Sequence, residues 1–318
     1  MFEFVDSHSV EAIVKVIGIG GAGCNTLGYL PRETLDGVEF IAIDTDPLAL
    51  GSAKADIKLQ ISGDFMPADG ESLRAMLRGT DMVFIIVAMG GRTGPNIAPI
   101  VAEIAREMGC LTVAIVIEPI TSEGEHLNIA RQGFEALSRQ VNALFVTPND
   151  KLHHQVSSPE DAFKAVNDML YDAVQGIVGL VVTRSGLINI NIHDVRLVMG
   201  EHGRGIVGSG TAAGEDRAEK AVNKALSSPL MTNKDLVCAR GILVNITAGL
   251  DMTIEEFEIV GDALKKLALE NATVVIGTVI DPNRGDELRV TVLATGISAD
   301  KKPEPSLADS GRKQISHE

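Results

Sequence analysis

Two glycine-rich segments contain the residues best suited to bind a phosphate group. The first runs from Gly18 to Asn25 and directly follows the apolar run Val14–Ile19. A glycine turn between a strand and a helix lets backbone N–H groups approach a phosphate, and the helix dipole adds to the attraction. The residues that we expect to line this loop are Gly20, Gly21, Ala22 and Gly23.

The second segment is Met89–Asn96, which lies between another apolar run and a helical pattern at Ile97–Met108. It combines glycines, a threonine hydroxyl and a helix N-terminus. Two such loops at the ends of successive strands indicate a diphosphate or triphosphate held from both sides. The candidate ligands here are Gly90, Gly91, Arg92, Thr93 and Gly94.

The first loop taken alone also fits a dinucleotide fingerprint. Gly18, Gly20 and Gly23 follow the G-x-G-x-x-G pattern, and Asp44 stands 21 residues after Gly23, where an acid would hold a ribose. A tight turn with no ligand is the other interpretation. The pattern therefore predicts nucleotide binding of some kind and leaves the nucleotide open.

The elements that must position these loops have the pattern of a doubly wound α/β domain. Short runs that are apolar on both faces are typical of parallel strands covered by helices. Strands alternating with helices predict that architecture. The expected strands are Val14–Ile19, Phe40–Ile43, Met82–Val87, Leu111–Ile117 and Ala143–Val146.

The second half of the chain has a different pattern. A long, largely apolar helix is expected from Pro159 to about Val182, and we place the domain junction along it. A smaller α/β domain follows, and the polar segment after Ile297 predicts a disordered tail. In the smaller domain the expected helices are Gly214–Leu226 and Thr253–Leu269, and the expected strands are Arg240–Thr247, Thr273–Val279 and Leu288–Thr295. The predicted boundaries are 1–158 for the nucleotide-binding domain, 159–184 for the central helix, 185–298 for the C-terminal domain and 299–318 for the tail.

Composition excludes several classes of function. The chain has 318 residues, and 28 Lys and Arg against 43 Asp and Glu give a net charge of −15. With two Tyr and no Trp, it has neither the basic surface nor the stacking aromatics of a nucleic-acid binder. No apolar run is long enough to cross a membrane, and the acidic N-terminus is unlike a signal peptide. The three separated cysteines indicate buried free thiols, and we expect a cytoplasmic protein with no metal site of cysteine ligands.

Beyond these patterns, the sequence resembles the FtsZ family, the bacterial homologues of tubulin, from about Ile13 to Ile297. The likeness is strongest in the segments GLINI, GSGTAAGEDRAEKA, ARGILVNITAGLD, NATVVIGT and DELRVTVLATGI, with NDKL and AVNDML before them. The resemblance implies a GTPase domain, a long central helix and a C-terminal activation domain. It also implies head-to-tail filaments in which a loop of one subunit completes the GTP site of the next.

The resemblance assigns further site residues. Asn25 in the first loop, Glu123, and the base-recognition residues Asn167 and Asp168 match the family. In the loop that acts on the neighbouring subunit, the family reads Asn-x-Asp-x-x-Asp, and this chain has Asn191 where the first acid is expected but keeps Asp194. We take both as the catalytic positions. Carboxylates there would orient a water or hold a cation, so GTP or GDP, with Mg²⁺, is the expected ligand.

Other departures also concern the nucleotide. The family's Gly-Gly-Gly-Thr-Gly-Thr/Ser-Gly becomes Gly-Gly-Arg-Thr-Gly-Pro-Asn, so Arg92, Pro95 and Asn96 replace small or flexible residues. Pro95 removes an N–H donor, Asn96 is a candidate cap for the next helix, and Arg92 either obstructs a phosphate or pairs with it. The loop at 61–70 is short and has Asp64 and Asp69, which would repel a terminal phosphate. An arginine expected after Glu123-Gly124 is missing.

These features predict a divergent FtsZ paralogue that assembles with itself or with an intact FtsZ, with altered nucleotide binding and weak or lost hydrolysis. The tail shows no motif for membrane-tethering adaptors, so recruitment to the membrane by that route is not expected. Because of the net charge of −15, no nucleic-acid partner is expected, and neither is direct membrane binding. Two alternatives remain: an active GTPase of the division ring, and a nucleotide-independent filament or regulator of another FtsZ.

Overall fold

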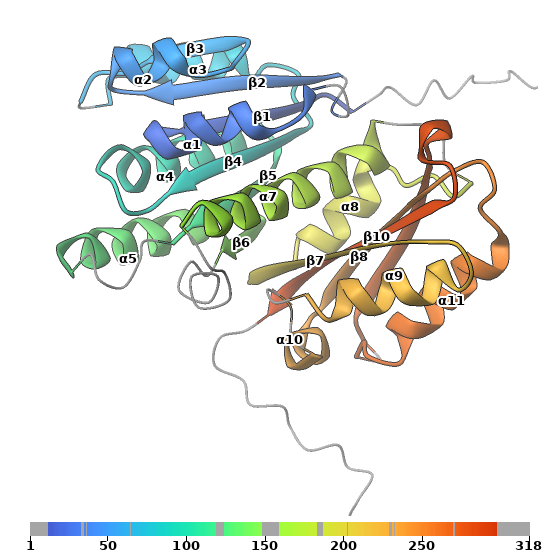
Figure 1. The fold of residues 1–318 in the computed structure, drawn as a ribbon. Helices are drawn as coiled ribbons and strands as arrows, with labels where there is room; N and C mark the ends of the chain where they lie inside the picture. Colours follow the sequence, from blue (N-terminus) through green and yellow to red (C-terminus); the bar gives the residue numbers. More distant parts are fainter. Residues whose placement is uncertain are drawn as a thin grey trace, which may run out of the picture.

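The computed structural model describes residues 12–32, 35, 37–63, 65–118, 124–147, 159–182, 187–201, 203–228, 231, 233–269 and 271–297. The predictions made for Asp64, Glu123, the NDKL segment and the tail lie outside these residues. Figure 1 shows the parallel strands of the first half above a second group of strands, with the helix α7 (Pro159–Val181) running between them.

Six parallel strands form the first part of the sheet, in the order β3-β2-β1-β4-β5-β6. This order reverses at β1 and β4, as in doubly wound folds, and it confirms the predicted fold class. The strands are β1 (Val14–Ile19), β2 (Val38–Asp44), β3 (Ile57–Gln60), β4 (Met82–Ala88), β5 (Leu111–Ile117) and β6 (Ala143–Thr147). Between them lie α1 (Gly20–Thr26), the short helix η1 (Leu27–Tyr29), α2 (Pro47–Ser52), α3 (Pro67–Met76), α4 (Thr93–Glu107) and α5 (Gly124–Ser138).

Helices cover both faces of these strands, which explains why the strands are apolar throughout. On one face, Cys24 and Leu27 after β1 pack in the same core as Leu170 and Val174 of α7. On the other face, side chains of α3, α4 and α5 form a second core. The site loops therefore sit on a rigid scaffold, with α1 and α7 on the same side of the sheet.

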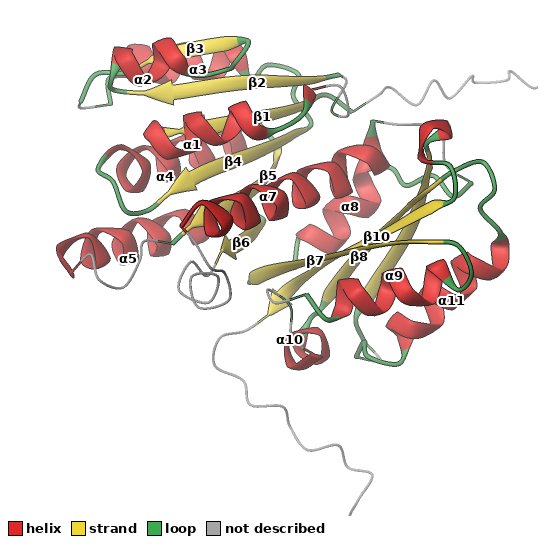
Figure 2. Ribbon diagram, viewed as in Figure 1, coloured by secondary structure: helices red, strands yellow, loops and turns green. Residues whose placement is uncertain are grey.

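The second half adds four strands to the same sheet. The strand β10 (Glu287–Ile297) lies antiparallel to β7 (Arg204–Ala213) and to β8 (Gly241–Ala248), and β8 pairs in parallel with β9 (Thr273–Ile280). A short parallel contact joins Leu144 and Phe145 of β6 to β7, so all ten strands form one continuous sheet. The helices described in this half are α8 (Ile192–Met199), α9 (Arg217–Leu226), α10 (Asn233–Cys238), α11 (Ile254–Lys265) and the short helix η3 (Pro282–Arg284). Figure 2 shows α8 on the side of these strands that faces α7, and α9 and α11 on the other side.

Around Gly214 the structure differs from the sequence-based expectations. The glycine-rich segment before Gly214 is the strand β7, which the sequence pattern did not indicate. The expected helix at 214–226 begins only at Arg217, because Gly214 and Asp216 have positive φ angles of 73° and 57°. Left-handed backbone cannot continue a right-handed helix.

Candidate functional site

In the first glycine loop, some glycines are needed for close packing, whereas others have open space beside them. A Cβ at Gly18 would lie 2.5 Å from the Gly23 carbonyl oxygen, and one at Gly23 would lie 2.5 Å from the Ile86 oxygen. These glycines let α1 pack closely on β1 and β4. At Gly21, in contrast, a Cβ would meet nothing within 4 Å. The exposed residues Gly21, Ala22 and Asn25 are therefore the ones that a ligand can reach.

The structure brings the second loop against the first. A Cβ at Gly20, whose φ is +73°, would lie 3.5 Å from the Gly94 nitrogen and 3.6 Å from Thr93 Cβ. Gly91 is open in the same way as Gly21, whereas Gly94 packs against the Ala88 carbonyl. The partly exposed Gly90 and Thr93 and the exposed Gly91 lie at the carboxyl end of β4. The two loops therefore form one cradle at the carboxyl edge of the sheet, where ligands of such folds bind.

The three substitutions in the second loop have different consequences. Arg92 is exposed, immediately precedes α4 and makes no side-chain capping bond. Pro95 is buried against α5, where a Cβ at Gly133 would lie 2.5 Å from Pro95 Cβ. The expectation that Asn96 caps the following helix is wrong, because α4 already begins at Thr93 and Asn96 lies inside its first turn. Pro95 thus removes one N–H from the helix end that faces the cradle.

Asp44 is used inside the protein rather than presented to a ribose. Its side chain is only 3% exposed, and Oδ1 accepts hydrogen bonds from the N–H of Thr45 at 2.7 Å and of Asp46 at 3.3 Å. The hydroxyls of Thr45 and Thr93 lie 3.2 Å apart and link the end of β2 to the second loop. Burial and the nearby Asp44 carboxylate also raise the pKa of the Cys24 thiol to about 12, which keeps it protonated. These contacts argue against the dinucleotide interpretation.

The connection from β3 to α3 spans only Ile61–Met66. The expectation that Asp69 faces a terminal phosphate is not met. Its Oδ2 accepts the Met66 N–H at 2.9 Å and closes the first turn of α3. An acid in this position stabilises the helix N-terminus, so Asp69 has a structural role.

Asn167 and Asp168 lie on α7, on the face of the sheet that α1 also covers. Asn167 is 7% exposed, yet neither its amide nitrogen nor its oxygen has a hydrogen-bond partner. A buried amide without partners costs about 1–3 kcal/mol, so a ligand that supplies a donor and an acceptor would be stabilised there. Asp168 is exposed. A guanine base fits this pair, because its ring edge carries both donors and an acceptor.

An ion pair that sequence reasoning missed connects α7 to the second half of the sheet. Arg289 on β10 pairs with Asp172, lies 5.5 Å from the centre of the Tyr171 ring and donates to Ser209 at 3.2 Å. Burial lowers the pKa of Arg289, an effect that Tyr171 and Asp168 oppose. The negative charge of Asp168 on α7 therefore favours the charged form of Arg289 on β10. No sequence spacing pointed to this contact.

Asn191 and Asp194 stand at the start of α8. Figure 1 shows α8 beside the C-terminal half of α7, whereas the carboxyl ends of β1 and β4, where the cradle lies, are toward the N-terminal end of α7. The Asn191 oxygen accepts the N–H of His193 at 2.8 Å and of Asp194 at 3.0 Å, and Asp194 Oδ2 accepts the Asn191 N–H at 3.1 Å. His193 is exposed, as expected for a surface residue. Within one subunit the two predicted catalytic residues therefore cannot reach the phosphate cradle.

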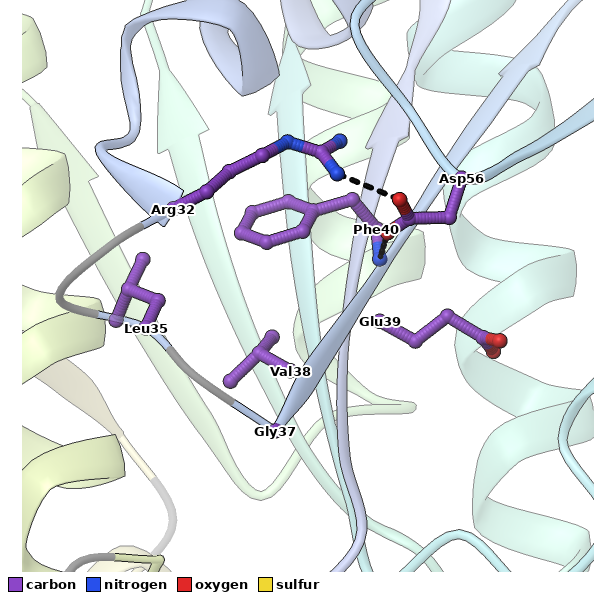
Figure 3. Close-up of a pocket in the computed structure, with 7 residues that line it drawn as sticks. All are labelled: Arg32, Leu35, Gly37, Val38, Glu39, Phe40 and Asp56. Atoms are coloured by element: carbon purple, nitrogen blue, oxygen red, sulfur yellow. Dashed lines mark hydrogen bonds and ion pairs between the residues drawn. The ribbon is translucent and has the colours of Figure 1, made fainter.

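A cavity of about 410 Å³ lies elsewhere, at the start of β2 (Figure 3). Arg32 pairs with Asp56, whose other oxygen accepts the Phe40 N–H at 2.8 Å, and the guanidinium lies 4.7 Å from the Phe40 ring centre. Burial raises the pKa of Asp56, but these hydrogen bonds and the Arg32 charge lower it further than burial raises it. The polar groups of this pair are thus satisfied within the protein, by each other and by the backbone of Phe40 and Lys54.

Among the described residues, histidine, cysteine, aspartate and glutamate side chains form no cluster of three or more that could hold a metal ion. No helix among those residues has the length and apolar character needed to cross a membrane.

Comparison with known proteins places this geometry in a family. Residues 13–157 match the GTPase domain of the Tubulin/FtsZ family, and residues 203–298 match the C-terminal domain of the FtsZ family. The chain is 45% identical to the cell division protein FtsZ of Wigglesworthia glossinidia brevipalpis, over 96% of this chain and 85% of that protein. The chain is 46% identical to the cell division protein FtsZ of Coxiella burnetii, over 94% of this chain and 82% of that protein.

Solved structures agree. An empty FtsZ dimer from M. jannaschii has a TM-score of 0.80 at 36% sequence identity. The matched region covers 91% of this chain and 90% of the M. jannaschii chain. The protofilament structure of CetZ2 from Haloferax volcanii shares the fold, with a TM-score of 0.73 at 19% sequence identity. The matched region covers 90% of this chain and 93% of the CetZ2 chain. On this sequence identity and shared structure, the chain belongs to the FtsZ family of tubulin-related proteins.

Proposed function

We propose that this protein is an FtsZ-type cytoskeletal subunit that assembles head to tail in the cytoplasm, in cell division or a related role. It does so with itself or with an intact FtsZ. Its site binds a guanine nucleotide in an altered way and hydrolyses GTP slowly or not at all. The curated relatives are named cell division proteins, which supports the process. The proposal that hydrolysis is slow or lost rests on Asn191 and Asp194 and on the changed second loop.

The base and the inner phosphates fit the residues present. Asn167 supplies a buried amide with two free polar atoms, and the open backbone at Gly21 and Gly91 leaves room for phosphate oxygens. A bound nucleotide would supply the substrate for phosphoryl transfer, while these residues hold and orient it. Because the net charge is −15, local backbone dipoles must provide the attraction.

The terminal phosphate fits less well. The connection Ile61–Met66 is short, and Asp69 is turned into the cap of α3. Pro95 offers no N–H at the start of α4. Fewer backbone donors therefore face the position of a third phosphate, and binding of a diphosphate is favoured over binding of a triphosphate.

The observation that carries the proposal is the hydrogen-bonded pair of Asn191 and Asp194. Asn191 is neutral, and Asp194, the carboxylate that is left, already accepts the Asn191 N–H. A single, partly engaged carboxylate orients a water or a cation less strongly than two free ones. Loss of a catalytic acid or base typically costs 10²–10⁴-fold in rate.

Assembly is supported by the surface around this pair. Leu187 is 61% and Ile188 is 41% exposed, and they stand four and three residues before Asn191. The cradle lies at the opposite end of α7 (Figure 1). A head-to-tail contact would place this loop against the cradle of the next subunit, which makes hydrolysis depend on assembly.

Phosphate release per subunit tests the proposal. The protein is compared with the FtsZ of Pseudomonas aeruginosa, a relative at 41% identity, under identical assembly conditions. We expect bound guanine nucleotide in the purified protein, filaments by electron microscopy and turnover at least tenfold below the relative. Turnover equal to the relative's and abolished by Asp194→Ala would overturn the claim of weak hydrolysis.

An active GTPase is the second candidate, and the exposure of Arg92 favours it. Its side chain caps nothing in α4, so the guanidinium is available to a phosphate. Arg92→Ala separates the two ideas. If Arg92 binds the nucleotide, the variant loses affinity and turnover. If Arg92 obstructs the loop, the variant gains affinity. Filaments in nucleotide-free buffer would instead identify the nucleotide-independent alternative.

A further inference from the structure

We infer that Thr278 is a positioning residue for the subunit-contact loop, which we define as residues 187–191. Thr278 lies on β9 and is 2% exposed. Its Oγ1 accepts the Ile188 N–H at 2.8 Å, and its own N–H donates to the Ile188 carbonyl oxygen at 3.0 Å. One residue therefore fixes both backbone polar groups of Ile188.

The neighbouring Gly277 provides a second attachment. A Cβ there would lie 2.4 Å from Ile190 Cδ1 and 2.6 Å from Leu180 Cδ2, so Ile190 and the end of α7 pack directly onto bare backbone. Ile190 is 7% exposed. The loop is thus held at two points, one polar at Ile188 and one apolar at Ile190.

These attachments decide what the loop presents to solvent. β9 is the last strand of the sheet, so the Thr278 N–H belongs to an edge that the loop covers. Because the Ile188 backbone is tied to that edge, the side chains of Leu187 and Ile188 project outward, where they are 61% and 41% exposed. Three residues later Asn191 caps α8, so the same attachment fixes where Asn191 and Asp194 stand.

The inference rests on the proposed function, because only an assembling subunit uses this loop as a contact. It adds that Thr278, which is buried behind the loop, sets the geometry of that contact. Thr278→Val removes the hydroxyl that accepts the Ile188 N–H and keeps the β-branched shape of the side chain. Thr278→Ser restores the hydroxyl and serves as the rescue.

The test has two readouts on the full chain. Amide hydrogen exchange of the unassembled subunit is followed over 187–199, and the critical concentration is measured by sedimentation. Thr273→Val, an exposed threonine at the start of the same strand, is the control. For Thr278→Val we expect exchange about fivefold faster, which corresponds to about 1 kcal/mol, and a critical concentration several-fold higher. Thr278→Ser and the control stay near wild type, and nucleotide affinity does not change.

The outcomes separate the two proposals. Unchanged exchange in Thr278→Val overturns the positioning role whether or not filaments form. Faster exchange with an unchanged critical concentration also overturns it, because the loop would then be held without consequence for the contact. A wild type that binds nucleotide but never assembles contradicts the proposed function, and with it the role of Thr278 in a subunit contact.

Discussion

Asn191 and Asp194 cap each other at the start of α8. The Asn191 oxygen accepts the Asp194 N–H at 3.0 Å, and Asp194 Oδ2 accepts the Asn191 N–H at 3.1 Å. Such a reciprocal pair satisfies N–H groups that the first turn of a helix leaves unpaired. The residues expected to act on a neighbouring nucleotide therefore also hold the fold in place, and the two roles can be separated by substitution.

Asn191→Asp is expected to raise phosphate release at least tenfold without loss of stability. Asp caps a helix about as well as Asn, and it adds the carboxylate that this loop lacks. Asn191→Ser caps without charge and is the matched control. Asn191→Ala should lower the free energy of unfolding by about 1 kcal/mol, measured by urea denaturation. If the Asp variant binds nucleotide and assembles but hydrolyses no faster than wild type, the neutral residue is not the cause of slow turnover.

Asn167→Leu is expected to keep or raise stability and to abolish the stabilising effect of GDP. The buried amide has no partner in the free protein, so replacing it with an apolar side chain of similar size removes a cost of about 1–3 kcal/mol. A bound base would instead pair with the amide. Thermal unfolding with and without GDP measures both effects. An equal GDP-induced shift in wild type and variant would remove Asn167 from the binding site.

Sequence patterns predicted the features that depend on local residues. The apolar strands, the long helix α7 and the Thr253 cap all follow from periodicity and short spacing. Thr253 and Glu256 have the Thr-x-x-Glu spacing of a capping box, and Thr253 Oγ1 accepts the Glu256 N–H at 3.2 Å. The pattern also predicted a smaller second domain, and family resemblance assigned it as the family's C-terminal domain, because the long matching segments lie there.

The features that were missed depend on contacts between distant residues. Pro95 packs on Gly133 across two helices, and Arg289 pairs with Asp172 across the junction. Asp69 turned out to cap α3 because the helix begins at Pro67, which places the acid three residues after the N-cap residue Met66, a boundary that composition does not reveal. Side chains that serve the fold and those that serve a ligand have the same residue types, so only the structure separates them.

Gly21→Ala is expected to leave stability unchanged and to weaken nucleotide binding at least tenfold. The added Cβ meets no atom of the protein within 4 Å, but it would stand where a phosphate approaches the backbone. Gly51→Ala, equally open but on α2, is the control. Affinity is measured with a fluorescent GDP analogue, and stability by thermal unfolding. Unchanged affinity in the Gly21 variant would show that the first loop does not hold the phosphates.

Glu256→Gln is expected to destabilise the protein in a pH-dependent way. Arg217 is 6% exposed, and its Nε donates to Glu256 Oε1 at 2.6 Å. Burial raises the pKa of Glu256, but hydrogen bonds from Arg217 and the Thr253 N–H outweigh it, and the pKa lies below its ordinary value. Since the unfolded chain takes up the proton first, this contribution is present above the unfolded pKa of about 4.3 and is lost as the pH falls through the lower folded pKa.

At pH 7 the variant should therefore lose on the order of 2 kcal/mol, the usual worth of a hydrogen bond to a charged group. The difference from wild type should begin to shrink below about pH 4.3, where the unfolded chain takes up the proton, and should disappear below the lowered folded pKa, where wild-type Glu256 is neutral as well. Urea denaturation across this range measures it, and Glu258→Gln, an exposed glutamate on the same helix, should show little difference at any pH. A gap that stays constant down to acid would mean that the Glu256 carboxyl keeps its charge there or contributes only through its shape.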